Sequence, residues 1–133
     1  MTVRIFDDGS GHGTTGFTLP VVTPADAMHA GDEGVLIAPD DSIAMRFNVG
    51  IRTLDAGAAL AIDVHDRIGE IRHTSTRELA ANWFNQMTGG DFAGVPLQSG
   101  DYIVIRVTRG SAILYGATVD NTTNDPSVQM VTR

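Results

Sequence analysis

The sequence predicts an all-β fold, an antiparallel β-sandwich of about eight strands in a single domain spanning residues 1–133. Apolar residues alternate with polar ones in many short segments, which is typical of strands that bury one face. Turn residues separate these segments, and Gly alone accounts for 15 positions. Apolar residues make up 42% of the chain, which is enough to build one core.

The first third of the chain holds three predicted strands, TVRIF (2–6), TGFTLPVV (15–22) and GVLIAP (34–39). Pro20 lacks a backbone N–H, so it confines the second of these to a sheet edge or to a strand end. Residues 23–32, TPADAMHAGD, predict one helical turn or loop, because Thr23 is a good cap and Pro24 suits the first helical position.

The middle third begins with the longest predicted strand, IAMRFNVGIRTL (43–54), and continues with AALAIDVHD (58–66). The next segment, GEIRHTSTREL (69–79), is more polar and predicts an edge strand or connector anchored by Ile71 and Leu79. These segments keep the period of two that strands require.

A helix is the competing prediction for STRELAANWFNQMTGG (75–90). Leu79, Trp83 and Met87 are spaced by four residues, and Ser75 followed by Glu78 matches a capping box. A sandwich tolerates one short helix near residues 75–88 in a crossover, so the all-β prediction holds with either assignment.

The last third contains DYIVIRVTR (101–109), AILYGATV (112–119) and SVQMV (127–131), which complete the predicted strands. The residues expected to face the core are apolar and lie in phase along their strands: Phe47, Val49, Leu60, Ile62, Val64, Ile103, Ile105 and Leu114.

Composition excludes several classes of function. The formal net charge is −7, and all nine basic residues are Arg. This charge argues against nucleic acid as a partner, because nucleic-acid binding depends on a clustered positive surface. Cys is absent, so disulfides and thiolate chemistry are excluded. No apolar run approaches the roughly 20 residues of a membrane span, and the first residues show no signal peptide.

The polar sequence DNTTNDPS (120–127) offers the first candidate site. Asp120, Asn121 and Asp125 carry oxygen ligands of the kind that Ca²⁺ prefers. The same residues are also strong turn formers, because Asp and Asn side chains bond to nearby backbone groups. We expect a turn between the last two strands, and a cation loop is the alternative.

Two other polar segments raise the same choice. Asp63 and His65 share one face of a predicted strand, which would suit a metal site or a solvated surface. Residues 7–16, DDGSGHGTTG, form a Gly-rich turn in which Asp7 and Asp8 could bind Ca²⁺. We favour the surface and turn interpretations for both segments.

Aromatic residues suggest a binding function. An exposed Trp83 or Tyr115 would give a flat surface on which a sugar ring could stack. The alternative is that Trp83 packs in the core. Hydrolase activity is a third alternative, although the sequence contains no strained G-x-S-x-G nucleophile turn.

Three segments in order resemble a known but uncharacterised domain: GTTGFTLPVV, RFNVGI and the closing YGATVDNTTNDP. The chain is similar to an immunoglobulin-like β-sandwich domain of bacterial secreted and surface multidomain proteins. The matching positions are Phe17, Pro20, Phe47, Val49, Gly50, Tyr115, Gly116, Val119, Asp120, Asn121, Thr123, Asp125 and Pro126.

This resemblance implies an immunoglobulin-like sandwich and an extracellular or cell-surface location, and it supplies no catalytic residues. Asn48 comes earlier here than in the family pattern, and Thr118 replaces a smaller residue. We therefore expect a non-catalytic, secreted accessory or adhesion-type module without a cofactor. A carbohydrate-binding module with structural Ca²⁺ is the alternative, and the expected partner is a polysaccharide or another protein.

Overall fold

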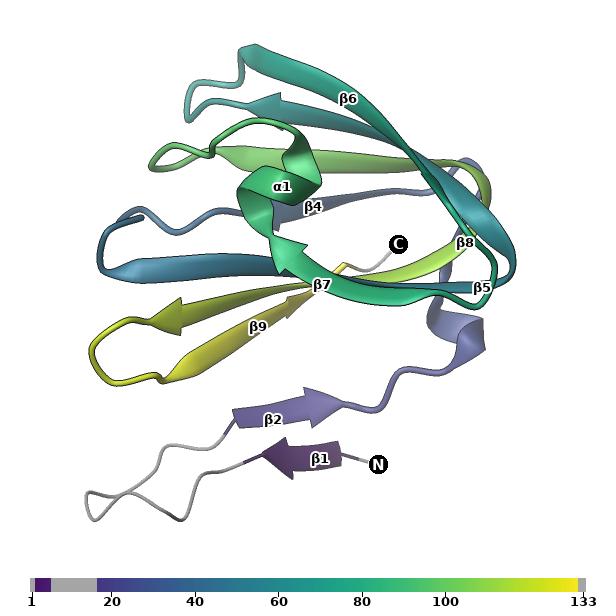
Figure 1. The fold of residues 1–133 in the computed structure, drawn as a ribbon, viewed down its shortest axis with the longest axis horizontal. Helices are drawn as coiled ribbons and strands as arrows, with labels where there is room; N and C mark the ends of the chain where they lie inside the picture. The colour runs from purple at the N-terminus through teal and green to yellow at the C-terminus, as the bar shows by residue number, and fades with distance from the viewer. Residues whose placement is uncertain (1, 6–16, 132–133) are drawn as a thin grey trace.

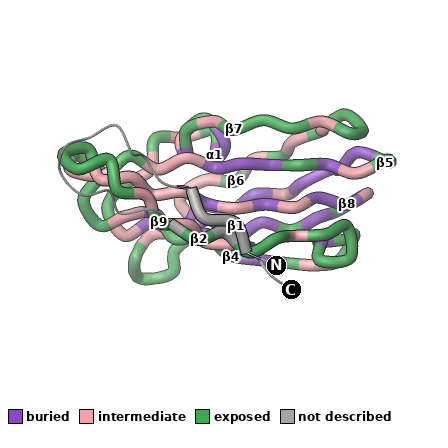
Figure 2. Tube along the Cα trace, turned by 90° about the horizontal axis from the view of Figure 1, so that it is seen from below, coloured by how far each residue is buried: buried purple, intermediate pink, exposed green. Residues whose placement is uncertain are grey.

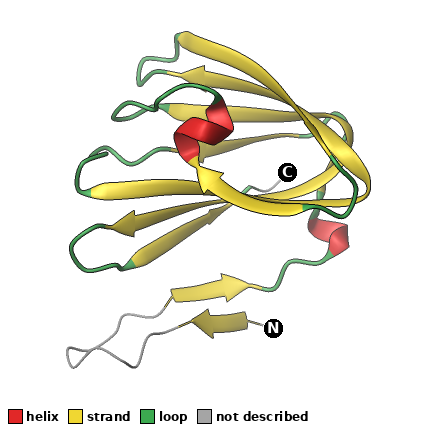
Figure 3. Cartoon of the chain, viewed as in Figure 1, coloured by secondary structure: helices red, strands yellow, loops and turns green. Residues whose placement is uncertain are grey.

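A computed structural model gives the fold and describes residues 2–5 and 17–131. Its elements, in chain order, are β1 (Thr2–Ile5), β2 (Phe17–Pro20), the 3-10 turn η1 (Pro24–Asp26), β3 (Met28–His29), β4 (Glu33–Ile37), β5 (Met45–His65), β6 (Ile71–Leu79), β7 (Phe84–Thr88), α1 (Gly89–Ala93), β8 (Tyr102–Asp120) and β9 (Pro126–Met130). All strand pairs are antiparallel, and the prediction of an all-β fold is confirmed (Figure 3).

Two long strands, β5 of 21 residues and β8 of 19 residues, pair along nearly their whole length and form the centre of the fold. The other five strands of this sheet each border one half of this pair. In one half of the β5–β8 pair, which we call the β9 half, β7 pairs with the start of β5 and β9 pairs with the end of β8. In the other half of the pair, which we call the β4 half, β6 pairs with the end of β5 and β4 pairs with the start of β8.

The sheet bends between the two halves, so that both halves lie on opposite sides of one core (Figure 1). The β5–β8 register shifts between Thr53 and Ala58 and again between Ala59 and Leu60. Such irregularities bend a strand and increase its twist. Gly57 and Gly110 both have positive φ at this bend, and a β-carbon on Gly110 would collide with the Gly57 carbonyl.

The core lies between the halves, and buried residues concentrate on β5 and β8 (Figure 2). Seven of the residues expected to face the core are buried: Val49, Leu60, Ile62, Val64, Ile103, Ile105 and Leu114. Phe47, also expected there, is partly buried and packs against this cluster. The alternation of apolar and polar residues therefore predicted correctly which side chains of the two long strands face the core.

The helix alternative for residues 75–88 is wrong, because the described chain forms β6, a turn and β7 there. A spacing of four fits a strand as well as a helix, and Leu79 and Met87 do pack against the core. The short helix α1 follows at residues 89–93, with Thr88 as its cap. Ile71 was predicted to anchor β6, but 59% of it is exposed because it lies at the strand's first position on the outer face.

The segment from α1 to the start of β8 packs against the inner side of β6 and closes that end of the sandwich. Ser75 Oγ donates to the Ala93 carbonyl at 2.8 Å, and Arg77 Nε donates to the Phe92 carbonyl at 2.8 Å. Asp101 is 1% exposed, pairs with Arg72 and accepts from the Gln98 N–H at 2.7 Å. These bonds hold the closing segment to an edge strand.

β4 and β9 border the same side of β8, and one side chain bridges them. Gln129 accepts from the Ile37 N–H at 2.9 Å and donates to the Ile37 carbonyl at 2.8 Å. A backbone residue of a neighbouring strand would make the same two bonds.

β1 and β2 form a separate hairpin that lies outside the main sheet, next to β9 (Figure 1). β2 ends at Pro20, as its missing N–H predicts, and the turn predicted after Thr23 is η1. The Gly-rich segment 7–16 lies outside the described residues, so its cation-loop hypothesis stays a prediction. Within the described chain, no helix has the length and apolar character of a membrane span.

Candidate functional site

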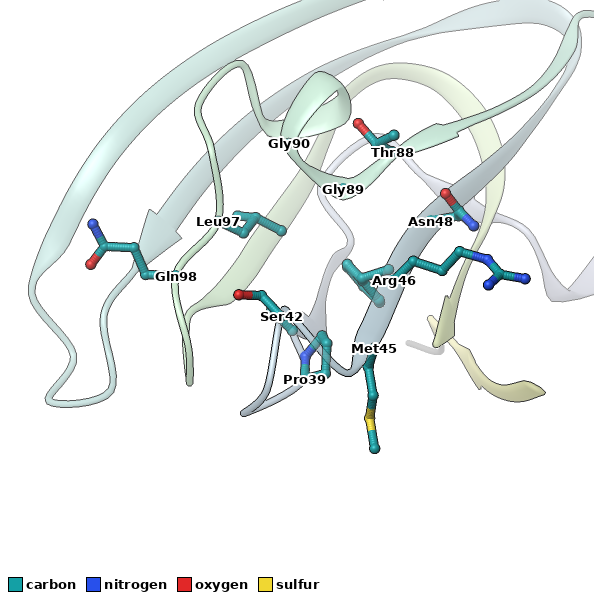
Figure 4. A pocket seen from close by; sticks show the side chains of 12 residues that line it. Pro39, Ser42, Met45, Arg46, Asn48, Thr88, Gly89, Gly90, Leu97 and Gln98 are labelled. Carbon is teal, nitrogen blue, oxygen red and sulfur yellow. The ribbon is translucent and has the colours of Figure 1, made fainter. Parts of the chain in front are cut away.

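Several hollows of about 280–500 Å³ mark the described surface. The first is a cleft of about 280 Å³ at the end of the sandwich, between residues 38–48 and 88–98 (Figure 4). Phe47 and Leu97 contact the position where Gly89 would carry a side chain, so they close its floor. Its polar side chains come from β5, β7 and two loops, and no hydrogen bond between two of these side chains is among the described contacts.

The second hollow, which we call the outer groove, lies on the outer face of the β9 half and has a volume of about 500 Å³. Its floor is formed by outward side chains of β8 and β9, and Pro20 at the end of β2 and Val22 just after it form a wall. Its lining residues are Pro20, Val22, Gln86, Ile113, Tyr115, Ala117, Val119, Pro126, Val128 and Met130. Gln86 is the one amide in this otherwise apolar and aromatic set.

Tyr115 lines the outer groove and contacts both β5 and β7. Its ring lies across Gly50, the residue directly opposite on β5, and a β-carbon at Gly50 would collide with the ring. The hydroxyl donates to Gln86 Oε1 at 2.8 Å, and Gln86 is itself opposite Gly50 on β7. Partial burial raises the pKa of the Tyr115 hydroxyl above its ordinary value of 10.0, because the phenolate loses hydration.

Trp83, the second predicted aromatic binding residue, does not join Tyr115. It precedes β7 and is partly buried against the core cluster, on the inner side of the sheet. Its backbone N–H donates to Thr53 Oγ1 at 2.9 Å, and its carbonyl accepts from the Thr53 N–H at 2.9 Å. The two aromatics therefore lie on opposite faces of the β9 half and cannot form one flat surface.

The polar residues Asp120, Asn121 and Asp125 are brought together in the turn between β8 and β9. One Asp120 oxygen accepts from the N–H groups of Thr122 at 2.7 Å and Thr123 at 2.9 Å. These two bonds lower the pKa of Asp120 below its ordinary value of 3.8, and the bond from Thr123 has the larger effect. The Asp120 N–H donates to the Asp125 carbonyl at 3.1 Å, which closes the hairpin.

A guanidinium occupies the side of this turn where the amide oxygens point. Arg46 donates to Asn121 Oδ1 and to Asn124 Oδ1, both at 3.1 Å, and Asn121 also bonds to the Ile43 carbonyl. Within residues 2–5 and 17–131, no three His, Asp or Glu side chains are close enough to share a metal ion. The turn expected from the sequence is present, and Ca²⁺ binding by Asp120, Asn121 and Asp125 stays a prediction.

Asp63 and His65 share the outer face of the β4 half, as their spacing predicts. Asp63 accepts from Thr74 Oγ1 at 2.8 Å. His65 stacks on Tyr102 with ring centroids 4.8 Å apart, and its Nδ1 lies 3.1 Å from the Gly69 carbonyl. Each side chain is thus engaged by a neighbour on its own sheet, as on an ordinary strand surface.

No protein-family model matches the chain. No curated protein matches it either. Among solved structures, the crystal structure of Thermotoga maritima 1070 is similar, with a TM-score of 0.56 and 12% sequence identity. The similarity covers 80% of this chain and 96% of that chain. At this identity the comparison supports the fold and carries no function.

The sequence interpretation did not find the outer groove, although one signal was available. From Ala112 to Ala117 the chain has no charged residue, so both faces of this part of β8 are apolar. A strand with one solvated face alternates in polarity, and this one does not. The outer face of β8 therefore offers an apolar surface, which Pro20 and Val22 border in the outer groove.

Proposed function

We propose that the protein is a non-catalytic binding module and that the outer groove is its binding site. The observation that carries this proposal is Tyr115, whose ring is fixed across Gly50 and whose hydroxyl is held by Gln86 inside an apolar groove. Small-molecule sites in proteins have the same composition, mostly apolar with a few fixed polar groups, and volumes of about 300–1,000 Å³.

The rigid support of the groove favours binding. Its floor consists of side chains on adjacent hydrogen-bonded strands, so a ligand meets a surface that is ordered before it binds. The resemblance of the sequence to modules of secreted and surface proteins leads us to propose an extracellular, accessory or adhesion-type role for this binding. The net charge of −7 agrees with a partner that is not a polyanion.

Carbohydrate binding is the second candidate, and the placement of Tyr115 favours it. A tyrosine ring that lies over a strand offers an apolar face to the apolar face of a sugar ring. Because Trp83 lies on the inner side, such a site would depend on Tyr115 and not on a Trp–Tyr pair.

A glycan array and a screen of small apolar compounds, each with wild-type protein and Tyr115→Ala, test both candidates. Tyr102→Ala is the matched control, because Tyr102 lies on the same strand but on the outer face of the β4 half. We expect a ligand whose binding is lost in Tyr115→Ala and kept in Tyr102→Ala. Binding that survives Tyr115→Ala would contradict the site, and a ligand recovered with a changed mass would contradict the non-catalytic assignment.

A further inference from the structure

The outer groove has a cationic neighbour on the same face of the sheet. Arg52 is directly opposite Ile113, which lines the groove, and two residues along β5 from Gly50. Side chains directly opposite on antiparallel strands share a face and lie about 5 Å apart at their β-carbons. Arg52 is therefore diagonal to Tyr115 on the same face and lies beside the Ile113 end of the groove, outside its lining.

The charge of Arg52 is available for a ligand. Arg52 is exposed, and its guanidinium makes one long bond, 3.4 Å, to the Asn82 carbonyl. The ion pairs of the described residues involve Arg67, Arg72, Arg106 and Arg109, and none involves Arg52. Arg46, at the opposite end of the groove, is committed to the β8–β9 turn through two amide oxygens.

Gln86 adds donors at the same place. Its Oε1 accepts from the Tyr115 hydroxyl, and its amide NH₂ remains a donor without a partner among the described hydrogen bonds. Gln86 follows Phe84, the direct partner of Arg52, by two residues on β7 and therefore lies on the same face. A guanidinium and an amide NH₂ thus border one end of the apolar groove, on a chain whose net charge is −7.

We propose that the outer groove binds a small amphipathic anion, with its apolar body on Tyr115, Ile113 and Met130 and its carboxylate at Arg52 and Gln86. This inference rests on the proposed function and specifies its ligand class. Charge complementarity carries it: a cation without an ion-pair partner beside an apolar groove matches a ligand with one anionic end.

Isothermal titration with three probes of equal chain length tests the proposal: decanoate, decanol and decyltrimethylammonium. We expect decanoate to bind the wild type more tightly than either of the others. Arg52→Gln should weaken decanoate binding about five-fold, as expected for a partly exposed ion pair, and should leave decanol binding unchanged. Arg109→Gln is the matched control, because it removes the same charge from the outer face of the β4 half.

The outcomes separate this inference from the proposed function. Equal binding of decanoate and decanol, unchanged by Arg52→Gln, would overturn the anionic ligand class and leave the groove as a binding site. Absence of decanoate binding to the wild type would also overturn it, while the screen with Tyr115→Ala would still decide the proposed function. A decrease of the same size in Arg109→Gln would show a general charge effect and would likewise overturn the role of Arg52.

Discussion

At the scale of single residues, the outer groove depends on a position where the chain has no side chain. Gly50 allows the Tyr115 ring to lie down on the sheet, and the ring in turn places its hydroxyl at Gln86. Residue 50 does not need glycine for its backbone conformation, since the φ angle of Gly50 is not positive. The reason is space, so a single methyl group at residue 50 should disturb the groove.

Gly50→Ala should lower the free energy of unfolding by about 1–3 kcal/mol, the usual cost of placing an extra methyl group in a packed site. Urea denaturation measures this change. In a Tyr115→Ala background the same substitution should cost much less, because the group with which it collides is gone. An equal cost in both backgrounds would contradict the packing of Tyr115 on Gly50.

Asp120 gives a prediction about acid stability. Its pKa is lowered in the folded protein by the N–H groups of Thr123 and Thr122, so its ionised form favours folding. That contribution is present above the ordinary value of 3.8 and is lost as the pH falls through the lower folded pKa.

Asp120→Asn should therefore flatten the dependence of unfolding free energy on pH below about 4. Asp55→Asn, at an exposed site in the bend of β5, is the control for the change in net charge. Identical pH profiles for wild type and Asp120→Asn would show that this turn does not favour the carboxylate.

At the scale of elements, the bend in β5 and β8 decides the architecture. Each long strand crosses from one half to the other, and the change of register at the bend lets the halves face each other over one core. Gly57 and Gly110 meet at this crossing, where the backbones approach too closely for a β-carbon on Gly110.

Gly110→Ala should cost more stability than the positive φ alone explains. Gly31→Ala is the matched control, because Gly31 also has positive φ but has open space around it. We expect about 1 kcal/mol for Gly31→Ala and at least twice that for Gly110→Ala, measured as the difference in free energy of unfolding. Equal costs would mean that the approach of the two strands is not rigid.

The same elements show what a sequence can and cannot predict. Alternation along residues 43–54 and 58–66 assigned the inner and outer faces, because a strand repeats every two residues. It could not join these segments into one strand, since Asp55 to Gly57 is a good turn sequence. These residues have no partner in the β8 register, and the pairs at Thr53 and Ala58 on either side carry the strand across the bend. Trp83 and Tyr115 were chosen by residue type, and only the strand register separates their faces.

At the scale of the whole molecule, the closing segment from α1 to β8 seals the core at one end of the sandwich, on the inner side of β6. Asp101 is its deepest polar residue, and it joins the segment to β6 through Arg72. The side chain of Asp101 is 2% exposed and that of Arg72 is 26% exposed, so the pair is partly shielded from water.

Asp101→Asn should lower the free energy of unfolding by about 2–4 kcal/mol, because it leaves a partly buried Arg72 without its counter-charge. Glu78→Gln is the control, since it breaks the exposed pair with Arg109 and should cost less than about 1 kcal/mol. Thermal and urea denaturation of both variants measure the difference. A cost for Asp101→Asn no larger than that of Glu78→Gln would contradict a sealing role.

The bridge from Gln129 to Ile37 has a consequence for how copies of the chain meet in solution. A strand with open N–H and C=O groups is a template on which another chain can add and aggregate. β4 is such a strand, and its outward side chains Val35 and Ile37 are 47% and 58% exposed. Gln129 occupies the N–H and C=O groups of Ile37, so another chain cannot pair with this end of β4. An added strand could pair only with the remaining residues of β4.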